Sequence, residues 1–318
     1  MQNKVKQFSL NQYLRNIFFN MHYFKSKISL RVNCHNQLIY ILNFHKVEKN
    51  FFQSGYPGID TTIFRALINW LDNHFEIIDI DAIDNFNDSK YPKLIISFDD
   101  GYKSFITDAL PVLKEYGIRA NQNIIPGCIN SGLPPMSVHL QDIFGQLTFK
   151  EIKNISPLKD INFLQNSIKN FSLSFATFFK KQSFESQKKI YQDILEHIPS
   201  KEYLVTEMMT IDDINDSKEY VDYGIHSFNH ASMTYNSMNY FIDDLDKCKS
   251  WFSNNVDAPL EIYAFPNGYY KKKHIDYLVR DGFRHILLVD EDSYKTGISK
   301  PRFTMYGSSV NELIYRFL

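Results

Sequence analysis

The residues best suited to chemistry are two adjacent carboxylates, Asp99 and Asp100, at the end of the apolar stretch "LIISFDDG". Leu94–Phe98 is typical of a buried strand, and catalytic groups of parallel α/β folds collect where strands run out into loops. Successive residues leaving a strand point in different directions, so one aspartate can bind a metal while the other acts as a base. On Asp-Asp-Gly alone, a helix N-cap is the competing interpretation.

A second group, His226 and His230, lies in "GIHSFNHAS" directly after the strand-like "YVDYGI". On a helical turn, an i, i+4 spacing puts two imidazoles on one side, which suits a divalent metal. Two unrelated surface or capping histidines are the alternative. Two histidines and one aspartate leave open coordination positions, which is typical of catalytic zinc. The same donors also serve non-haem iron oxygenases, so ligand type alone does not determine the chemistry.

The elements around these residues alternate between strand and helix, which predicts a parallel sheet with helices outside. "QLIYILNFH" indicates a strand from residue 38 to 44 that ends in His45. "TTIFRALINWLDNHF" has helical apolar spacing, with Thr61 or Thr62 as N-cap. Between about residues 134 and 207 helical patterns replace this alternation. We expect a helical insertion there, acting as a lid, a partner surface or a packing subdomain.

Composition narrows the class of protein. The chain has 318 residues and a net charge of −1, which gives no indication of a nucleic-acid partner. Three separated cysteines (Cys34, Cys128 and Cys248) argue against a disulfide framework and a thiolate zinc site. Polar residues interrupt the apolar stretch from 14 to 24, so we expect no signal peptide, no transmembrane segment and a cytoplasmic location. Peripheral membrane association through residues 1–37, an N-terminal extension, stays open.

Three motifs together carry a resemblance to a known family. Residues 97–101 match (T/S)FDDG, residues 226–230 match H(S/T)xxH, and "YAFPNGYY" (263–270) matches a variant third motif. The sequence resembles the polysaccharide deacetylase family, which shares a homology domain with the nodulation chitooligosaccharide deacetylase. "NFHKV" and "KPRF" are similar to the opening and ending of one branch. The resemblance spans about residues 38–302, apart from the insertion.

The resemblance implies an α/β fold, an irregular (β/α) barrel of the deacetylase type with a helical insertion, over residues 38–318. It implies that Asp100, His226 and His230 hold a metal and that Asp99 is the general base. Zinc is the first expectation, and nickel, cobalt, manganese or iron would also suit these donors. Residues next to the motifs, Tyr102, Pro266 and Asn267, are expected at the substrate, with an amide near Asn267 as oxyanion donor.

Two departures from the family pattern concern the ends of the chain. Ala264 stands where the third motif usually has an arginine, so the residue that orients the base must come from elsewhere. Arg302 is our candidate, with an ordinary surface arginine as the alternative. The C-terminal motif that supplies the general acid is missing as well. His45 fits this role in a circularly permuted branch, similar to poly-N-acetylglucosamine deacetylases, and His285 is the alternative acid.

The activity implied is metal-dependent removal of N-acetyl groups from an amino-sugar-containing glycan or glycolipid, releasing acetate. The substrate would be an N-acetylated polymer, an oligosaccharide or a sugar-lipid. An O-acetyl esterase and a catalytically inactive glycan-binding domain are the alternatives. Sequence patterns do not address the oligomeric state.

Overall fold

The computed structural model describes residues 19, 39–49, 51–52, 54–56, 58–84, 91–155, 158, 167–289 and 299–318. The N-terminal extension expected at 1–37 lies outside this part of the chain, apart from Phe19.

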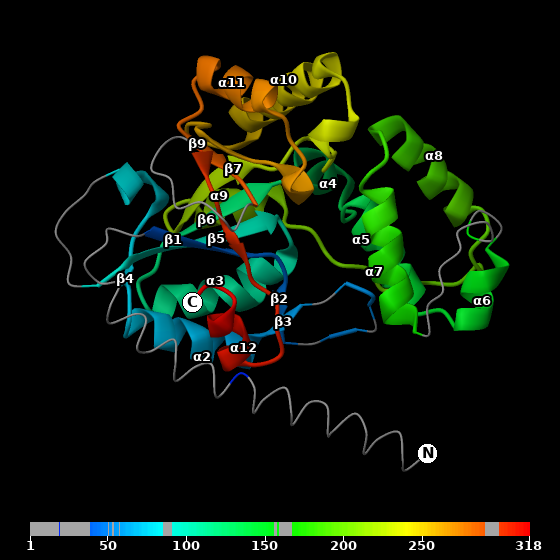
Figure 1. Cartoon of the computed structure of the whole chain (residues 1–318), viewed down its shortest axis with the longest axis horizontal. Coiled ribbons are helices and arrows are strands. Elements are labelled where there is room, and N and C mark those ends of the chain that lie inside the picture. The colour runs from blue at the N-terminus through cyan, green and yellow to red at the C-terminus, as the bar shows by residue number, and fades with distance from the viewer. Residues whose placement is uncertain are drawn as a thin grey trace, which may run out of the picture.

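The centre of the fold is a parallel sheet in the order β10-β9-β8-β7-β6-β5-β1-β11, with β4 beside β5 (Figure 1). Its strands are β1 (Ile39–Phe44), β4 (Glu76–Ile77), β5 (Lys93–Asp100), β6 (Ala120–Ile124), β7 (Val221–Ile225), β8 (Ile262–Ala264), β9 (His285–Leu287), β10 (Ser299–Lys300) and β11 (Phe303–Thr304). Burial on both faces explains why β1 and β5 are almost continuously apolar. A separate pair is formed by β2 (Val47–Glu48) and β3 (Ile59–Asp60).

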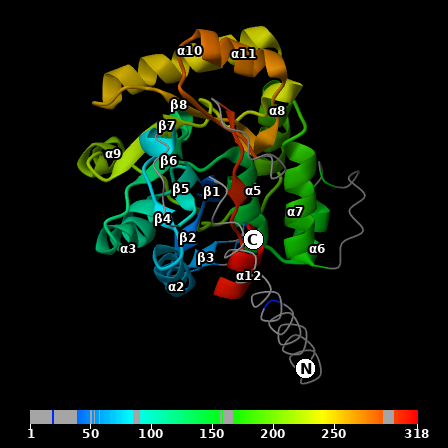
Figure 2. The same cartoon turned by 60° about the vertical axis from the view of Figure 1, so that its left-hand side comes forward.

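One short segment connects the two ends of this curled sheet. Lys300 pairs with Leu287 of β9, and Phe303 pairs with Leu42 of β1. Only Pro301 and Arg302 separate β10 from β11, so the same segment contacts both edges of the half-barrel (Figure 2). The expected irregular α/β barrel of the deacetylase type is confirmed.

Helices cover the outside of the sheet, as the strand–helix alternation predicts. They are α2 (Thr61–Asp72), α3 (Leu110–Glu115), α4 (Pro126–Ser131), α9 (Ile211–Ser217), α10 (Met238–Asn255), α11 (Lys272–Arg280) and α12 (Val310–Tyr315). The apolar face expected for α2 is buried, at Phe64, Leu67, Ile68 and Leu71. Its N-cap is Asp60 and not a threonine, because the Asp60 carboxylate accepts from the amides of the first turn.

The stretch between α4 and α9 is helical, as expected. It contains α5 (Met136–Gly145), α6 (Phe149–Asn154), α7 (Ile168–Phe179) and α8 (Phe184–Leu195), here called the insertion helices. Figure 1 shows them together at one side of the barrel. They enclose an apolar cluster of their own, which includes Leu140, Phe144, Phe171, Phe175 and Ile194.

Among the described helices, none combines the length and the apolar character that crossing a membrane requires.

Candidate metal centre and active site

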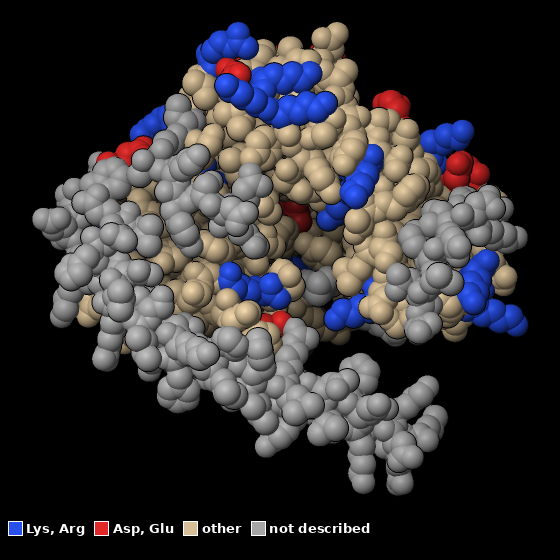
Figure 3. All heavy atoms as spheres, in the orientation of Figure 1, with Lys and Arg blue, Asp and Glu red and all other residues tan. Residues whose placement is uncertain are grey.

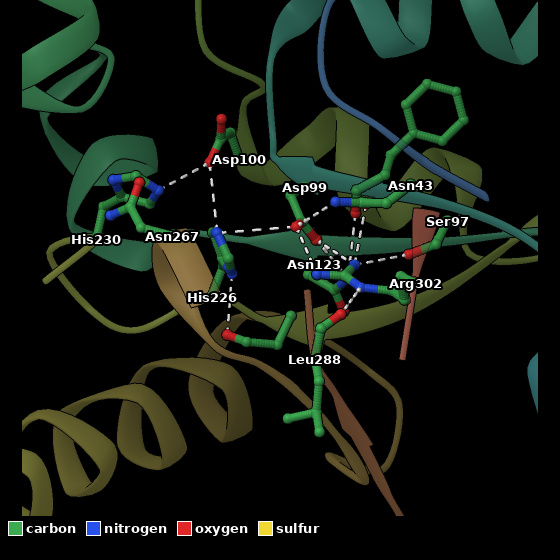
Figure 4. Close-up of polar contacts among 12 residues, drawn as sticks. Asn43, Ser97, Asp99, Asp100, Asn123, His226, His230, Asn267, Leu288 and Arg302 are labelled. Carbon is green, nitrogen blue, oxygen red and sulfur yellow. Dashed lines mark hydrogen bonds and ion pairs between the residues drawn. The ribbon is translucent and has the colours of Figure 1, made fainter. Parts of the chain in front are cut away.

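Asp99 and Asp100 are the last two residues of β5, and both are buried. Asp100 has a φ of 79° and Gly101 a φ of 76°, so the chain leaves the strand through the left-handed region. A non-glycine residue there is strained, and such strain is common at functional sites. The reversal separates the two carboxylates: Asp100 turns towards the histidines, and Asp99 stays within the sheet (Figure 4).

The two histidines lie on a loop after β7 and not on the helical turn that we expected. Ser227 and His230 both have positive φ, 63° and 59°. Asp244 of α10 holds the loop: its carboxylate accepts from the Phe228 amide at 2.9 Å and from the Ser227 hydroxyl at 3.3 Å. The spacing of the two imidazoles therefore depends on a buried carboxylate from the following helix.

Asp100, His226 and His230 form a ligand set in which the donor atoms all lie within 4.8 Å of one another. Asp100 Oδ1 is 3.3 Å from His230 Nε2 and 3.7 Å from His226 Nε2. This carboxylate oxygen is buried and has no hydrogen-bond donor within the described residues. A buried acceptor without a donor is costly unless a cation satisfies it. The set is consistent with a divalent metal site.

Histidine chemistry agrees with this assignment. His226 Nδ1 lies 2.9 Å from the carbonyl oxygen of Ala264, which can only accept, so Nδ1 carries the proton. The lone pair of Nε2 is then free and points at Asp100, as in metal sites that orient an imidazole through a backbone carbonyl. Burial lowers the pKa of both His226 and His230, which favours the neutral form that binds metals.

Asp99 is joined to Arg302 by two hydrogen bonds, Nη1 to Oδ1 at 2.8 Å and Nη2 to Oδ2 at 2.7 Å. Asn123 Nδ2 donates to Oδ1 at 2.8 Å, and Asn43 Nδ2 donates to Oδ2 at 2.9 Å. Arg302 is completely buried and also donates to Asn43, Ser97 and the Leu288 carbonyl (Figure 4). The structure therefore places Arg302 at the base and not on the surface.

Charge determines the protonation state of Asp99. Burial alone would raise the pKa of this carboxyl, but the Arg302 guanidinium, with a smaller effect of His226, holds the pKa well below its usual range. Burial raises the pKa of Asp100. The two neighbours therefore differ: Asp99 is a permanent anion held by four donors, and Asp100 is an anion that needs a cation.

A cavity of about 250 Å³ opens onto this set and is lined by Asp99, Asp100, His226, His230, His45 and Asn267. Burial lowers the pKa of His45, against the opposing effect of Asp100 and then Asp99. Asn267 has a φ of 58°, and its side-chain amide donates to the Ser232 hydroxyl at 3.1 Å.

Three other candidates lie elsewhere. Tyr102 is completely buried and packs against Tyr56, so its ring is not available to a sugar, and Tyr56 lines the cavity instead. Pro266 is buried behind Asn267 and is not part of the cavity wall. His285 stands at the beginning of β9, where its Nε2 lies 3.2 Å from Asp81. Strand beginnings and strand ends are at opposite edges of a parallel sheet, so His285 is not placed as an acid.

Sequence patterns did not identify Asn43, Asn123, Tyr56 and Lys180 as parts of the site. Asn121 and Asn123 are two residues apart on buried β6, and Asn43 is two residues before His45 on β1. Buried amides on one face of a strand indicate a polar network, so this signal was available. Lys180, at the end of α7, gave no such signal.

Solved structures with this fold include known deacetylases. One is the Streptococcus pyogenes deacetylase PplD in complex with acetate, at a TM-score of 0.59 and 13% identity over 88% of this chain and 98% of that one. Another is IcaB from Ammonifex degensii, at a TM-score of 0.55 and 12% identity over 89% and 98%. A third is a de-N-acetylase from Aggregatibacter actinomycetemcomitans, at a TM-score of 0.53 and 16% identity over 88% and 99%.

The chain has the polysaccharide deacetylase fold. At these identities the likeness concerns the fold alone, and it extends over nearly the whole of each solved chain. No protein-family model matches the sequence. No curated protein matches it either. What the site does must therefore be argued from its own residues.

Proposed function

We propose that this protein is a metal-dependent hydrolase that removes N-acetyl groups from an amino-sugar-containing glycan or glycolipid and releases acetate. The observation that carries the proposal is the buried Asp100–His226–His230 set, which opens onto a cavity at the strand ends of a deacetylase fold. Asp99, an anion beside this set, adds a group that binding alone does not require.

The roles of the residues follow from their chemistry. A divalent ion, with zinc as our first choice, would polarise the acetamide carbonyl and acidify the attacking water. Asp99 accepts the proton of that water, and Arg302, Asn43 and Asn123 hold its carboxylate in one orientation. His45, on the wall of the same cavity, protonates the leaving amine. The backbone amide near Asn267 donates to the oxyanion.

The circularly permuted branch is part of this proposal. His45 follows the first strand of the described sheet, and Arg302 lies in the segment next to it, so both ends of the chain contribute to the site. The corresponding groups of the usual motif order, the third-motif arginine and the C-terminal histidine, are replaced by residues from β1 and from the β10–β11 connection.

The test is acetate release from N-acetylglucosamine oligomers by the zinc-loaded chain, with and without a chelator, under anaerobic conditions. We expect release that stops with chelator and returns with zinc. Release from O-acetylated glycans only would make the protein an esterase. Dependence on oxygen would indicate an oxygenase, and metal binding without release from any acetylated glycan would indicate a binding domain.

A further inference from the structure

A second cavity, of about 440 Å³, adjoins the one at the metal centre. The two share part of their walls, at His45, Tyr56, Thr177, Lys180 and Thr304. The rest of the second wall is largely apolar and includes Ile59, Leu173, Ala176, Met305 and Tyr306. A ligand with its acetamide at the metal centre can therefore extend into this second space.

The charges on the second wall have one sign. Lys46 and Lys180 line it together with His45, and among the described residues no aspartate or glutamate does. Lys46 Nζ lies 3.1 Å from Glu48, which balances its charge. Lys180 has no hydrogen bond or ion pair from its ammonium group to any part of the chain that the structure describes.

Lys180 is held in place by the insertion helices. It caps α7, and the neighbouring Phe175 and Phe179 are buried in the apolar cluster of the insertion. Lys180 also faces Asp100 across the first cavity, and this carboxylate partly offsets the effect of burial, which lowers the pKa of Lys180. Figure 3 shows acidic atoms at the bottom of a hollow and basic side chains at its edge.

A lysine in this place requires an anion. A divalent ion bound by Asp100 uses the one carboxylate that faces Lys180 and adds positive charge next to it. Burying a cation without a partner is unfavourable, so a negatively charged ligand group between the two would be stabilised.

We propose that Lys180 binds a phosphate or carboxylate group that the substrate carries next to its acetylated sugar. The substrate class would then be an anionic glycan or a phosphate-linked glycolipid, with any apolar part in the second cavity. This inference rests on the proposed function for the position of the acetamide, but binding of the anion can be measured without turnover.

The binding test uses the zinc-loaded full chain and isothermal titration calorimetry with three probes. These are N-acetylglucosamine, N-acetylglucosamine 1-phosphate and a disaccharide of N-acetylglucosamine and glucuronic acid. We expect at least one anionic probe to bind about tenfold or more tightly than the neutral sugar, as charge-assisted hydrogen bonds imply. The probe that gains affinity distinguishes a phosphate from a carboxylate.

Lys180→Gln should abolish this preference, and Lys181→Gln, a change at the adjacent exposed lysine, should keep it. If Lys180→Gln keeps the preference, the anion binds elsewhere, at the metal for example, and the proposal is wrong. Equal binding of all three probes to the parent protein would overturn it as well. Both results stand whether or not the protein hydrolyses anything.

Kinetics supply a second readout. In Lys180→Gln, the kcat/KM for the better anionic probe relative to the neutral sugar should fall about tenfold or more. An equal fall for both sugars would mean that Lys180 stabilises the oxyanion of the reaction and not an anion of the substrate, which contradicts the proposal.

Discussion

Arg302 and Asp99 form a buried two-point ion pair, at 2.8 and 2.7 Å, between residues that are 203 positions apart. Arg302 lies in the two-residue connection between the strands that contact the two edges of the sheet. The same pair therefore orients a carboxylate at the metal centre and attaches the C-terminal segment to the barrel.

Arg302→Met should destabilise the fold, because it leaves the Asp99 charge buried without its partner. Loss of one member of a buried pair costs about 3–5 kcal/mol in free energy of unfolding. Urea denaturation measures the change. Arg65→Gln, which breaks an exposed pair with Glu115, is the matched control and should behave as the parent does. Equal stability of Arg302→Met and the parent would contradict the structure.

Asp99→Asn should retain the metal and lose turnover, because Asp99 accepts a proton and is not one of the three ligands. A fall in kcat of about 10²–10⁴-fold is expected for loss of a general base. Metal content, measured by mass spectrometry of the folded variant, should match the parent. Near-normal turnover would show that another group is the base.

Zinc should stabilise the folded chain, since Asp100, His226 and His230 come together only there. At zinc concentrations of 100 times Kd, the gain is about 2.7 kcal/mol. Thermal unfolding with zinc and with chelator measures it. His230→Gln should remove the gain, whereas His197→Gln, at an exposed histidine, should not. An unchanged gain in His230→Gln would place the metal elsewhere.

His45→Ala should affect amide substrates more than esters, because an amine is the poorer leaving group and needs a proton. We expect a loss of about 10²–10⁴-fold in kcat on an N-acetyl sugar and a smaller one on p-nitrophenyl acetate. His285→Ala, remote from the cavity, is the control for loss of a buried imidazole. Equal losses on both substrates for His45→Ala would remove its role as acid.

Asp244, which holds the histidine loop, should make stability depend on pH. Burial raises the pKa of this carboxyl to about 6, above its unfolded value, so the folded state binds the proton more tightly. The stabilisation from Asp244 is complete at low pH and is lost as pH rises towards 6. Relative to Asp244→Asn, the parent should lose about 3 kcal/mol between pH 4 and 7. Chemical denaturation across this range measures the difference, and a constant difference would contradict the prediction.

Local patterns in the sequence were sufficient for the elements and for the metal ligands. The apolar spacing of α2, the buried strands β1 and β5, and the helical character of the insertion all follow from periodicity within a few residues. Asp100, His226 and His230 were recognisable because each directly follows a strand, and parallel strand ends meet at one edge of a sheet.

What only the tertiary structure decided are relationships across long distances in the chain and the direction of individual side chains. The sequence by itself named Arg302 and His45 but did not show that one is buried against Asp99 and the other lines the cavity. Tyr102 and Tyr56 look alike in sequence, yet only Tyr56 lines the cavity. Lys180 contributes to the site through the packing of a helix 80 residues beyond Asp100. Sheet order and packing set such relationships, and periodicity along the chain carries no record of them.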